Sequence, residues 1–264
     1  MLVCPVRECH QALTREERQW VCPRGHSFDV ARSGYINLLQ PQDRRSKHPG
    51  DTAAAVAARR RLHDRGVSGP LLRAMAEMMA ASAGDVVLDA GCGDGFYLGT
   101  LGNEAGFDAH GVDISTHAVV AAARRYSPVE KQFEWIVANA DRYIPYADRS
   151  FSTVLSITAR MNAAEFRRVL RDDGRLLVGI PSPEDLIELR SHMGEAGRDR
   201  VERTLKTFAD DFILVDRRRV TTAADLDAAA VQDILVSIYR PMRSQAVGGM
   251  RVTFSLDLLL FRPA

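Results

Sequence analysis

Residues 87–95 read Val87-Leu88-Asp89-Ala90-Gly91-Cys92-Gly93-Asp94-Gly95, an apolar strand end, an acid, and then glycines at every second position. Glycine lets the backbone turn tightly and approach a ligand without a Cβ in the way. The helix predicted to follow, residues 96–105, presents N-terminal N–H groups that suit a carboxylate or phosphate. The spacing misses the G-x-G-x-x-G dinucleotide fingerprint, because Phe96 occupies the place of its last glycine. The stretch therefore predicts a strand, a ligand-binding loop and a helix.

Three further pieces follow this loop in order: Gly111-Val112-Asp113-Ile114-Ser115, Val137-Ala138-Asn139-Ala140-Asp141 and Phe151-Ser152-Thr153-Val154-Leu155. A carboxylate at the end of the second strand can accept both hydroxyls of a ribose. A side-chain amide or acid at the end of the third can read an adenine edge. Two other interpretations stay open: glycines that serve only as turns, and a nicotinamide-binding domain.

These four pieces, in this order, resemble the class I S-adenosylmethionine-dependent methyltransferases. The resemblance implies that Gly91, Gly93 and their neighbours Asp89 and Asp94 hold the methionine end of the cofactor. It implies that Asp113, followed by Ile114, holds the ribose, and that Asn139 and Ala140 flank the adenine.

The segments around these motifs alternate between strand-like and helix-like patterns. Strands are expected at 86–89, 109–113, 133–138, 151–157, 175–180, 212–220 and 250–261, and helices at 52–65, 71–83, 96–105, 115–126, 163–170, 184–196 and 223–236. Ser115 is the expected N-cap of its helix. This alternation predicts an α/β fold with a doubly wound, mostly parallel sheet, and the last strand suits an antiparallel closing position.

Three of the four cysteines lie within the first 22 residues. Cys4 and Cys9 form one short-spaced pair, and Cys22 with His26 forms a second after twelve residues. Such pairs can close a tetrahedral structural zinc site, whose binding energy supplies what a short segment cannot obtain from a core. His10 is an alternative fourth ligand, and a metal-free knot of reduced cysteines is the alternative to zinc. The predicted division is a zinc-binding module at 1–40, a basic linker with helices at 41–83, and a cofactor-binding methyltransferase domain at 84–264.

Composition sets broad limits on the class of protein. Hydrophobic residues make up 46% and charged residues 26%, as in ordinary globular proteins. No apolar run approaches the roughly 20 residues that span a bilayer, and the N-terminus lacks a signal-peptide pattern, so a cytoplasmic location and no membrane partner are expected. Residues 1–73 hold 13 Lys or Arg and 7 Asp or Glu, a balance of +6, against −5 for the remainder. This asymmetry suggests an anionic partner at one end, or simply uneven surface charge.

The front end carries a second and more specific resemblance. Its pieces are Cys22-Pro23-x-x-His26-x-Phe28-Asp29, Gly34-Tyr35-Ile36-Asn37-Leu38-Leu39, Arg44-Arg45-Ser46-x-x-Pro49-Gly50-Asp51 and Ala58-Arg59-Arg60. With the methyltransferase motifs, they resemble the bacterial 23S ribosomal RNA guanine-N1 methyltransferases. The resemblance is strongest over residues 9–115 and thin after 195. Two departures stand out: the first ligand pair is spaced x4 rather than x2, and Thr158-Ala159-Arg160-Met161-Asn162 stands where a Tyr-Ala-Pro-like segment is expected near the methyl acceptor.

This family resemblance implies methylation of 23S ribosomal RNA at N1 of a guanine in a hairpin loop, as a housekeeping modification or for macrolide resistance. The cofactors implied are S-adenosylmethionine and a structural zinc, and the oligomeric state stays open, a dimer included. Arg44, Arg45 and Lys47, with Arg59, Arg60 and Arg61, are candidate phosphate contacts. Asp141 and Asp185 are considered as proton acceptors, but no catalytic residue is assigned. The alternatives are a small-molecule methyltransferase with the zinc module as a lid, and a non-catalytic RNA-binding protein.

Overall fold

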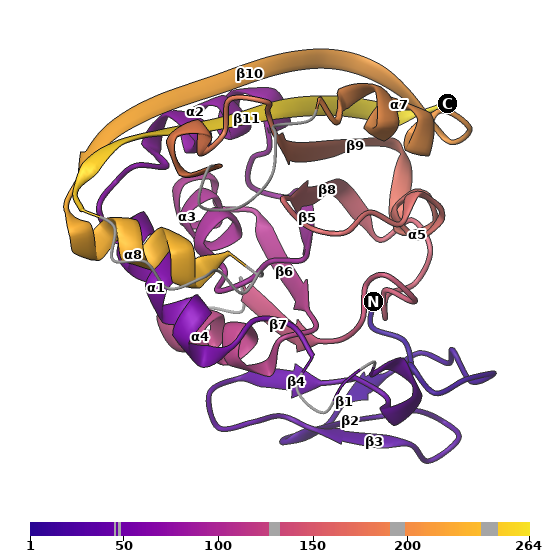
Figure 1. Cartoon of the computed structure of the whole chain (residues 1–264). Coiled ribbons are helices and arrows are strands. Elements are labelled where there is room, and N and C mark those ends of the chain that lie inside the picture. Colours follow the sequence, from indigo (N-terminus) through magenta and orange to yellow (C-terminus); the bar gives the residue numbers. More distant parts are fainter. Residues whose placement is uncertain (45, 47–48, 127–132, 191–198, 239–247) are drawn as a thin grey trace.

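A computed structural model describes the 264-residue chain except for residues 45, 47–48, 127–132, 191–198 and 239–247 (Figure 1). Its described part contains an eight-stranded sheet in the order β10-β11-β9-β8-β5-β6-β7-β4 and a three-stranded sheet in the order β1-β2-β3. The strands are β1 (Thr14–Arg15), β2 (Gln19–Val21), β3 (Ser27–Asp29), β4 (Tyr35–Asn37), β5 (Val86–Ala90), β6 (Asp108–Asp113), β7 (Phe133–Val137), β8 (Phe151–Ile157), β9 (Leu170–Pro181), β10 (Phe212–Leu226) and β11 (Met250–Pro263).

The large sheet is mostly parallel. All neighbours from β4 to β9 pair in parallel, whereas β11 pairs antiparallel with β9 and β10 pairs antiparallel with β11. This confirms the predicted doubly wound sheet and its antiparallel closing strand. The carboxyl ends of β5, β6 and β7 meet at one edge, where ligands bind in open α/β sheets.

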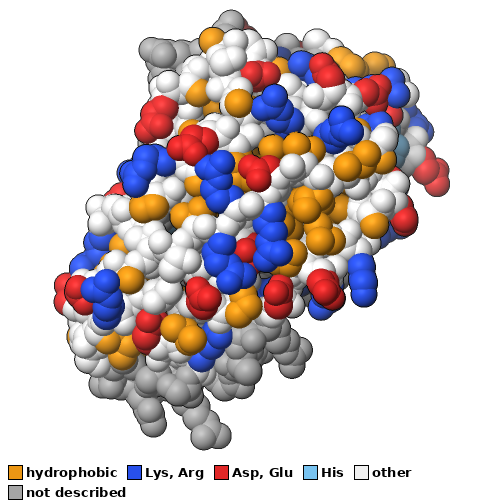
Figure 2. Space-filling view, turned by 90° about the horizontal axis from the view of Figure 1, so that it is seen from above, with side chains coloured by type: hydrophobic (Ala, Val, Ile, Leu, Met, Phe, Trp, Pro, Cys, Tyr) orange, Lys and Arg blue, Asp and Glu red, His pale blue; other side chains and the backbone are white. Residues whose placement is uncertain are grey.

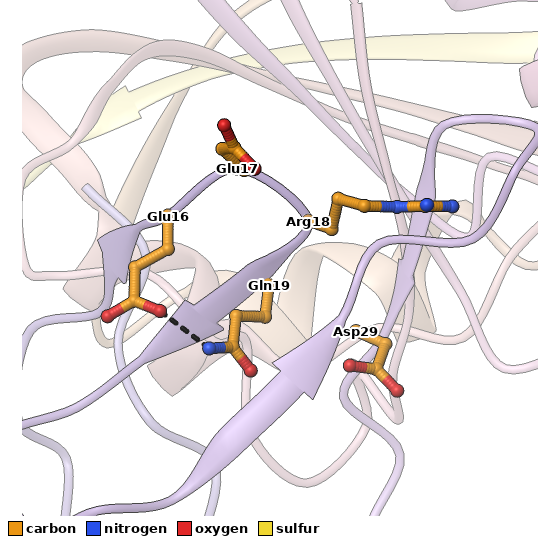
Figure 3. Close-up of a pocket in the computed structure, with 5 residues that line it drawn as sticks. All are labelled: Glu16, Glu17, Arg18, Gln19 and Asp29. Carbon is orange, nitrogen blue, oxygen red and sulfur yellow. Dashed lines mark hydrogen bonds between the residues drawn. The ribbon is translucent and has the colours of Figure 1, made fainter.

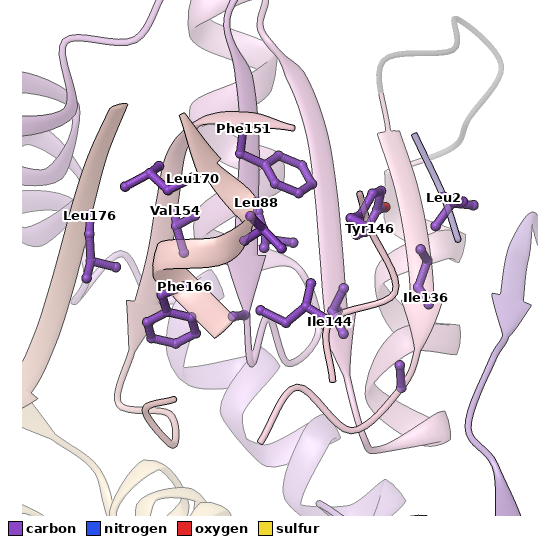
Figure 4. Packing of buried hydrophobic residues seen from close by; sticks show 14 of the residues in the cluster. Leu2, Leu88, Ile136, Ile144, Tyr146, Phe151, Val154, Phe166, Leu170 and Leu176 are labelled. Carbon is purple, nitrogen blue, oxygen red and sulfur yellow. The ribbon is translucent and has the colours of Figure 1, made fainter. Parts of the chain in front are cut away.

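Helices cover both faces of this sheet (Figure 1). They are α1 (Ala53–Asp64), α2 (Gly69–Met79), α3 (Phe96–Ala105), α4 (Thr116–Arg125), α5 (Ala163–Val169), α7 (Val201–Phe208) and α8 (Ala228–Ser237), with short 3-10 turns η1 (Pro41–Asp43) and η3 (Ile187–Leu189). Met75, Leu98 and Val119 of α2, α3 and α4 pack into one core cluster. Phe166 and Phe208 of α5 and α7 belong to the cluster on the other face, part of which is shown in Figure 4.

The expected elements agree closely with the structure up to residue 180 and less well beyond it. The predicted helix at 223–236 is wrong at its start, because residues 223–226 continue β10 and pair with β11 as far as Leu226 opposite Met250. Strand pairing there overrides the helix propensity of alanine. The helix α8 begins only where Asp227 caps it, accepting from the backbone N–H of Ala230 at 2.8 Å. In the predicted helix at 184–196, η3 is a 3-10 turn and residues 191–198 lie outside the described part, while α7 was not predicted.

The N-terminal segment is joined to the main body through its backbone and its core. Strand β4 pairs with β7 and so forms one edge of the large sheet. Leu2 forms an antiparallel bridge with Tyr146, and the cysteines of the segment are buried in the same cluster as Ile136. The predicted domain boundaries at residues 40 and 83 stay a prediction. Among the described residues, none of the helices has the length and apolarity needed to cross a bilayer.

Candidate cofactor and zinc sites

Asp113 ends β6 and closes the glycine loop. Its Oδ2 accepts a hydrogen bond from the backbone N–H of Gly93 at 2.9 Å, and its Oδ1 accepts one from that of Ser115 at 2.7 Å. Ser115 caps α4 by accepting from the N–H of Ala118, as predicted. Burial raises the pKa of Asp113. Each carboxylate oxygen keeps a second lone pair, so the predicted ribose hydroxyls can still bind here.

Asp89 lies in the interior at the end of β5 and is only 1% exposed. Its Oδ1 has no hydrogen-bond partner among the described residues. Burial, and then the charge of the neighbouring Asp113, raises the pKa of Asp89 to about 8. An unpaired buried acceptor is rare in a folded protein, and a water molecule or a ligand that donates to it would satisfy it. An ammonium group, such as that of an amino-acid cofactor, fits this position.

The glycine loop is packed tightly from behind. Gly91 has φ +96°, and a Cβ there would lie 2.4 Å from the Cβ of Ala159. A residue with a side chain at Gly91 would therefore force the loop and the segment after β8 apart. Gly91 thus makes room for a close contact within the chain, and the close approach of a ligand that the glycine pattern predicted stays a prediction.

The backbone donors of this loop are largely used within the chain. The N–H groups of Gly91 and Cys92 both donate to the carbonyl of Val112, at 2.8 and 3.1 Å, and that of Gly95 donates to the carbonyl of Cys92. Gly93 donates to Asp113, as described above. We call the space bordered by the glycine loop, residues 91–95, the cradle. A carboxylate bound in the cradle needs hydrogen-bond donors other than these four groups.

The predicted adenine residues lie at the carboxyl end of β7, next to β6. The Nδ2 of Asn139 donates to the carbonyl of Asp43 at 2.9 Å, and its Oδ1 accepts from the N–H of Asp141 at 3.1 Å. Ala140 packs against the core cluster on one face of the sheet, and Ile114 packs against the cluster on the other. The side chain of Asn139 is thus held by the turn η1, a contact that the sequence did not predict.

Residues 40–51, which we call the strap, connect β4 with α1, and the described residues at its two ends contact this edge. Besides the contact of Asp43, the carbonyl of Asp51 accepts from the Ser115 hydroxyl at 2.7 Å. Gly50 has φ +82°, and a Cβ there would meet the Cβ of Ser115 at 2.6 Å. The strap therefore contacts the ends of β6 and β7 at two separate points. Asp43 and Asp51 were not among the predicted site residues, although Asp51 stood in one of the quoted motifs.

The arginines 59–61 are not the free basic surface that was expected. Arg59 pairs with Asp51 at 2.6 Å, Arg60 with Asp94 at 2.7 Å, and Arg61 with Asp233. Arg60 also donates to the Asp94 carbonyl, so the predicted cofactor residue Asp94 is held by an arginine. Of the other candidate phosphate contacts, Arg44 is exposed, whereas Arg45 and Lys47 lie outside the described residues.

The segment 158–162, which departs from the expected pattern, lies against the glycine loop through Ala159. Thr158 has φ +53°, a left-handed conformation that a β-branched residue rarely adopts and that clusters at functional sites. Arg160 reaches Asp141 at 3.4 Å, and Asn162 donates to the Asp141 carbonyl at 2.8 Å. Asp141 therefore belongs to the rim beside the loop.

The other candidates from the sequence lie away from an open surface or are already engaged. Phe96 is buried and stacks on His63 with ring centroids 3.9 Å apart, so its ring packs inside the protein. Tyr97 meets the same histidine edge-on. Burial raises the pKa of Asp185 to about 6, and its Oδ1 accepts from the N–H of Ser255.

Cys4, Cys9, Cys22 and His26 converge as predicted, with their ligand atoms all within 4.8 Å of one another. The Sγ atoms of Cys9 and Cys22 are 3.8 Å apart, and the Nδ1 of His26 lies 3.4 Å from the Sγ of Cys4 and of Cys22. Tetrahedral zinc with bonds of about 2.3 Å to sulfur separates its ligand atoms by about 3.7 Å. The four residues therefore fit a structural zinc ion.

Backbone turns produce this convergence despite the longer first spacing. Cys9 donates to the carbonyl of Val6, and Glu8 takes a left-handed φ of +61°, which turns the chain back toward the cluster. His10, the alternative ligand, instead packs its ring against Tyr143 at 4.5 Å. Among the two histidines considered, the structure thus selects His26.

The zinc module also has a shallow hollow lined by Glu16, Glu17, Arg18, Gln19 and Asp29 (Figure 3). Gln19 donates to Glu16 across it. Three acids against one arginine do not suit a phosphate, and the hollow lies at the β2–β3 sheet rather than at the glycine loop. It is not part of the cofactor site.

Comparison with known proteins agrees with this geometry. Residues 2–47 match the zinc-ribbon family model described as "RlmA, N-terminal", and residues 87–177 match a methyltransferase domain model. Among solved structures, a putative methyltransferase in complex with the Haloferax volcanii Trm112 activator has a similar fold, with a TM-score of 0.56 and 19% identity over 80% of this chain and 94% of that one.

The sequence relatives are more informative. The 23S rRNA (guanine(748)-N(1))-methyltransferase of Streptomyces fradiae is 36% identical, covering 87% of this chain and 81% of the relative. A putative 23S rRNA (guanine-N(1)-)-methyltransferase of Micromonospora griseorubida is also 36% identical, covering 73% and 70%. With the zinc cluster and the glycine loop in place, these matches show that the chain belongs to the family of 23S rRNA guanine-N1 methyltransferases.

Proposed function

We propose that this protein transfers a methyl group from S-adenosylmethionine to N1 of a guanine in a hairpin loop of 23S ribosomal RNA. The observation that carries the proposal is the family membership, which extends over 81% of the Streptomyces fradiae relative. The buried, unpaired Asp89 oxygen beside a tight glycine loop supports a cofactor with an ammonium group at this edge. The small-molecule alternative has no comparable support.

The proposed cofactor contacts follow the strand ends. Asp89, Gly91, Gly93 and Asp94 surround the methionine end, Asp113 and Ile114 take the ribose, and Asn139 and Ala140 flank the adenine. S-adenosylmethionine supplies a methyl group on a sulfonium, which is transferred by direct displacement. The chain's own contribution is alignment: Asp113 fixes the loop through Gly93, and the loop fixes the distance between cofactor and base.

The acceptor base must approach from the open side of the loop. Segment 158–162 packs against Gly91 and supplies the rim residues Asp141 and Arg160. A guanine in a hairpin loop has to be splayed out of its stack to reach such a site. Loss of the N1 proton during transfer requires an acceptor, and we assign no residue to that role.

Binding of the RNA backbone is proposed for the zinc module and the strap. Exposed arginines there include Arg7, Arg15, Arg18, Arg32 and Arg44. At the opposite end of the molecule, the surface over β10 and β11 carries cationic and acidic side chains close together (Figure 2), as in the ion pair between Arg218 and Glu77. The zinc module carries exposed acids as well, at Glu16, Glu17 and Asp29, so the proposal rests on its exposed arginines and not on a single sign of charge.

The test is methyl transfer from labelled S-adenosylmethionine to unmodified 23S RNA, with the product mapped by primer extension. Methylation at guanine N1 blocks the Watson–Crick edge, so we expect one strong stop in a hairpin loop. The Asp113→Ala variant serves as the control for cofactor-dependent signal. Label incorporated without a stop would place the methyl group elsewhere on the RNA, and turnover of a metabolite without RNA would support the small-molecule alternative. Macrolide susceptibility of cells with and without the active enzyme distinguishes resistance from housekeeping.

A further inference from the structure

Arg59 extends from α1 over the open side of the glycine loop. Its Nη1 lies 3.7 Å from the position that a Cβ on Gly93 would occupy. The guanidinium therefore faces the side of Gly93 on which this residue carries no side chain. Its side chain is 31% exposed, so it borders the cradle without being sealed inside the protein.

Two neighbouring groups hold Arg59 in this position. Nη1 donates to Asp51 Oδ2 at 2.6 Å, and Nη2 donates to the carbonyl of Ser237 at the end of α8, at 3.1 Å. These contacts come from the strap on one side and from α8 on the other, so the planar fork is fixed in orientation. Among the described partners they use two of its five N–H donors. Donors therefore remain for a ligand.

The adjacent arginines differ from Arg59 in what they hold. Arg60 uses Nε on the Asp94 carboxylate and Nη2 on the Asp94 carbonyl, so it fastens the loop itself. Arg61 makes two bonds to Asp233 of α8. Arg59 is the member of the trio that lies over the cradle.

The acidic side chains next to the glycine loop make a cation such as Arg59 favourable for binding a carboxylate. The buried Asp89 and the half-buried Asp113 lie next to the loop, and four loop N–H groups already donate within the chain. The amino-acid end of the proposed cofactor carries an ammonium and a carboxylate. The ammonium can pair with the Asp89 oxygen that lacks a partner, but the carboxylate would lie near the Asp113 carboxylate unless a cation accompanied it. Planar guanidinium is well suited to carboxylate because it can donate two parallel bonds.

We infer that Arg59 binds the α-carboxylate of S-adenosylmethionine and so positions the methionine end of the cofactor. The inference rests on the proposed function, because it takes the cradle to be the site of this cofactor. Asp51 keeps the guanidinium oriented over the loop, and the strap that carries Asp51 thereby links the zinc module to cofactor binding.

The test compares two ligands on the full-length, zinc-loaded protein by calorimetry. S-adenosylmethionine and its decarboxylated form differ only in the carboxylate. We expect Arg59→Ala to weaken binding of S-adenosylmethionine about ten- to hundredfold and to leave binding of the decarboxylated ligand within about twofold. Arg59→Lys keeps the charge but loses the fork, so its loss should be smaller. Arg61→Ala is the matched control, and it should change neither affinity.

The possible results distinguish the role of Arg59 from the proposed methyltransferase function. Equal loss of both ligands in Arg59→Ala, or unchanged affinity for S-adenosylmethionine, would overturn the role of Arg59 while leaving the cofactor site in place. Failure of the wild-type protein to bind S-adenosylmethionine would overturn the proposed function and this inference together. Thermal unfolding of each variant confirms that the fold is retained.

Discussion

In the zinc module, four side chains converge on one point, whereas in the cofactor cradle the backbone forms most of the surface and a few acids are buried behind it. The cysteines and His26 are close together because of the turns that follow each ligand. The cradle exists because β5 and β6 pair, and its loop is closed by Asp113 rather than by a ligand. From this comparison we expect the first site to need its metal ion for folding, and the second to keep its shape through hydrogen bonds within the chain.

The largest effect is expected from the zinc cluster. Cys22→Ser should lose the one zinc ion per chain and disorder residues 1–40, because structural zinc contributes on the order of 10 kcal/mol to the folding of small zinc domains. Elemental analysis and hydrogen exchange measure the two effects. Cys92→Ala, which removes the cysteine outside the cluster, should retain zinc. A wild-type protein without zinc, or a Cys22→Ser protein with it, would contradict the comparison.

The second effect is the contribution of Asp89 to the pH dependence of stability. The pKa of Asp89 is raised from 3.8 to about 8, chiefly by burial. Between these values the unfolded chain releases a proton that the folded chain keeps, so stability falls as pH rises from 4 to 8. At about 1.4 kcal/mol per pKa unit, the change is up to about 5 kcal/mol. Asp89→Asn should flatten the pH profile of the free energy of unfolding measured in urea. An identical profile in wild type and variant would contradict the raised pKa of Asp89.

Gly91→Ala tests whether the backbone forms the cradle. A Cβ at Gly91 meets Ala159, whereas Gly84 has a similar φ of +94° with nothing within 4 Å. Both substitutions to alanine should cost about 1–2 kcal/mol of stability through the left-handed backbone. Only Gly91→Ala should also weaken cofactor binding, by about a hundredfold or more. Equal cofactor affinities in the two variants would mean that the close contact with Ala159 does not shape the site.

Asp113→Ala should weaken cofactor binding about ten- to hundredfold while the fold survives. Hydrogen bonds to a charged group contribute roughly 1.5–3 kcal/mol, and Asp113 is the predicted partner of the ribose hydroxyls. Asp108→Ala, at the exposed opposite end of the same strand, is the control. Calorimetry that finds wild-type affinity in Asp113→Ala would reject the ribose assignment.

The smallest effect concerns the RNA. Replacing Arg44 and Arg45 together by alanine should reduce the slope of log affinity against log salt concentration by about one to two units. Binding of the RNA releases fewer counterions when the protein makes fewer phosphate contacts. Cofactor affinity should not change. Removing Arg61 and Arg65, which pair with Asp233 and Asp227, takes away the same charge and should leave the slope unaltered. Equal slopes in the two double variants would mean that Arg44 and Arg45 do not contact RNA phosphates and only add charge to the surface.

The sequence predicted those features whose chemistry is local. The glycine loop, the Ser115 cap and the four zinc ligands each depend on residue types at a fixed short spacing, and the structure brings them together as expected. The first eight predicted elements of the α/β core followed in the same way, because each is fixed by its own apolar pattern.

The features that the sequence did not predict depend on partners far along the chain. Arg61 binds Asp233, which is 172 residues away along the chain. Without knowledge of this partner, the basic stretch 59–61 was predicted to be a surface that contacts phosphates. The end of β10 is set by its pairing with β11 rather than by its alanines. Likewise, no local signal places β4 beside β7 or puts Asp43 against Asn139. Such contacts become visible only when the chain is folded.

The pairing of β4 with β7 has a further consequence for the protein when metal is scarce. The strand β7 carries Trp135, Ile136 and Val137, and among the described residues its outer row of N–H and C=O groups pairs with β4 and with the N–H of Leu38. An uncovered, apolar strand edge is a template for pairing with other chains. Loss of zinc would release β4 and expose this edge, so the metal ion protects the enzyme against aggregation as well as ordering its N-terminal segment. Zinc supply would then determine how much of the newly made enzyme escapes aggregation and degradation.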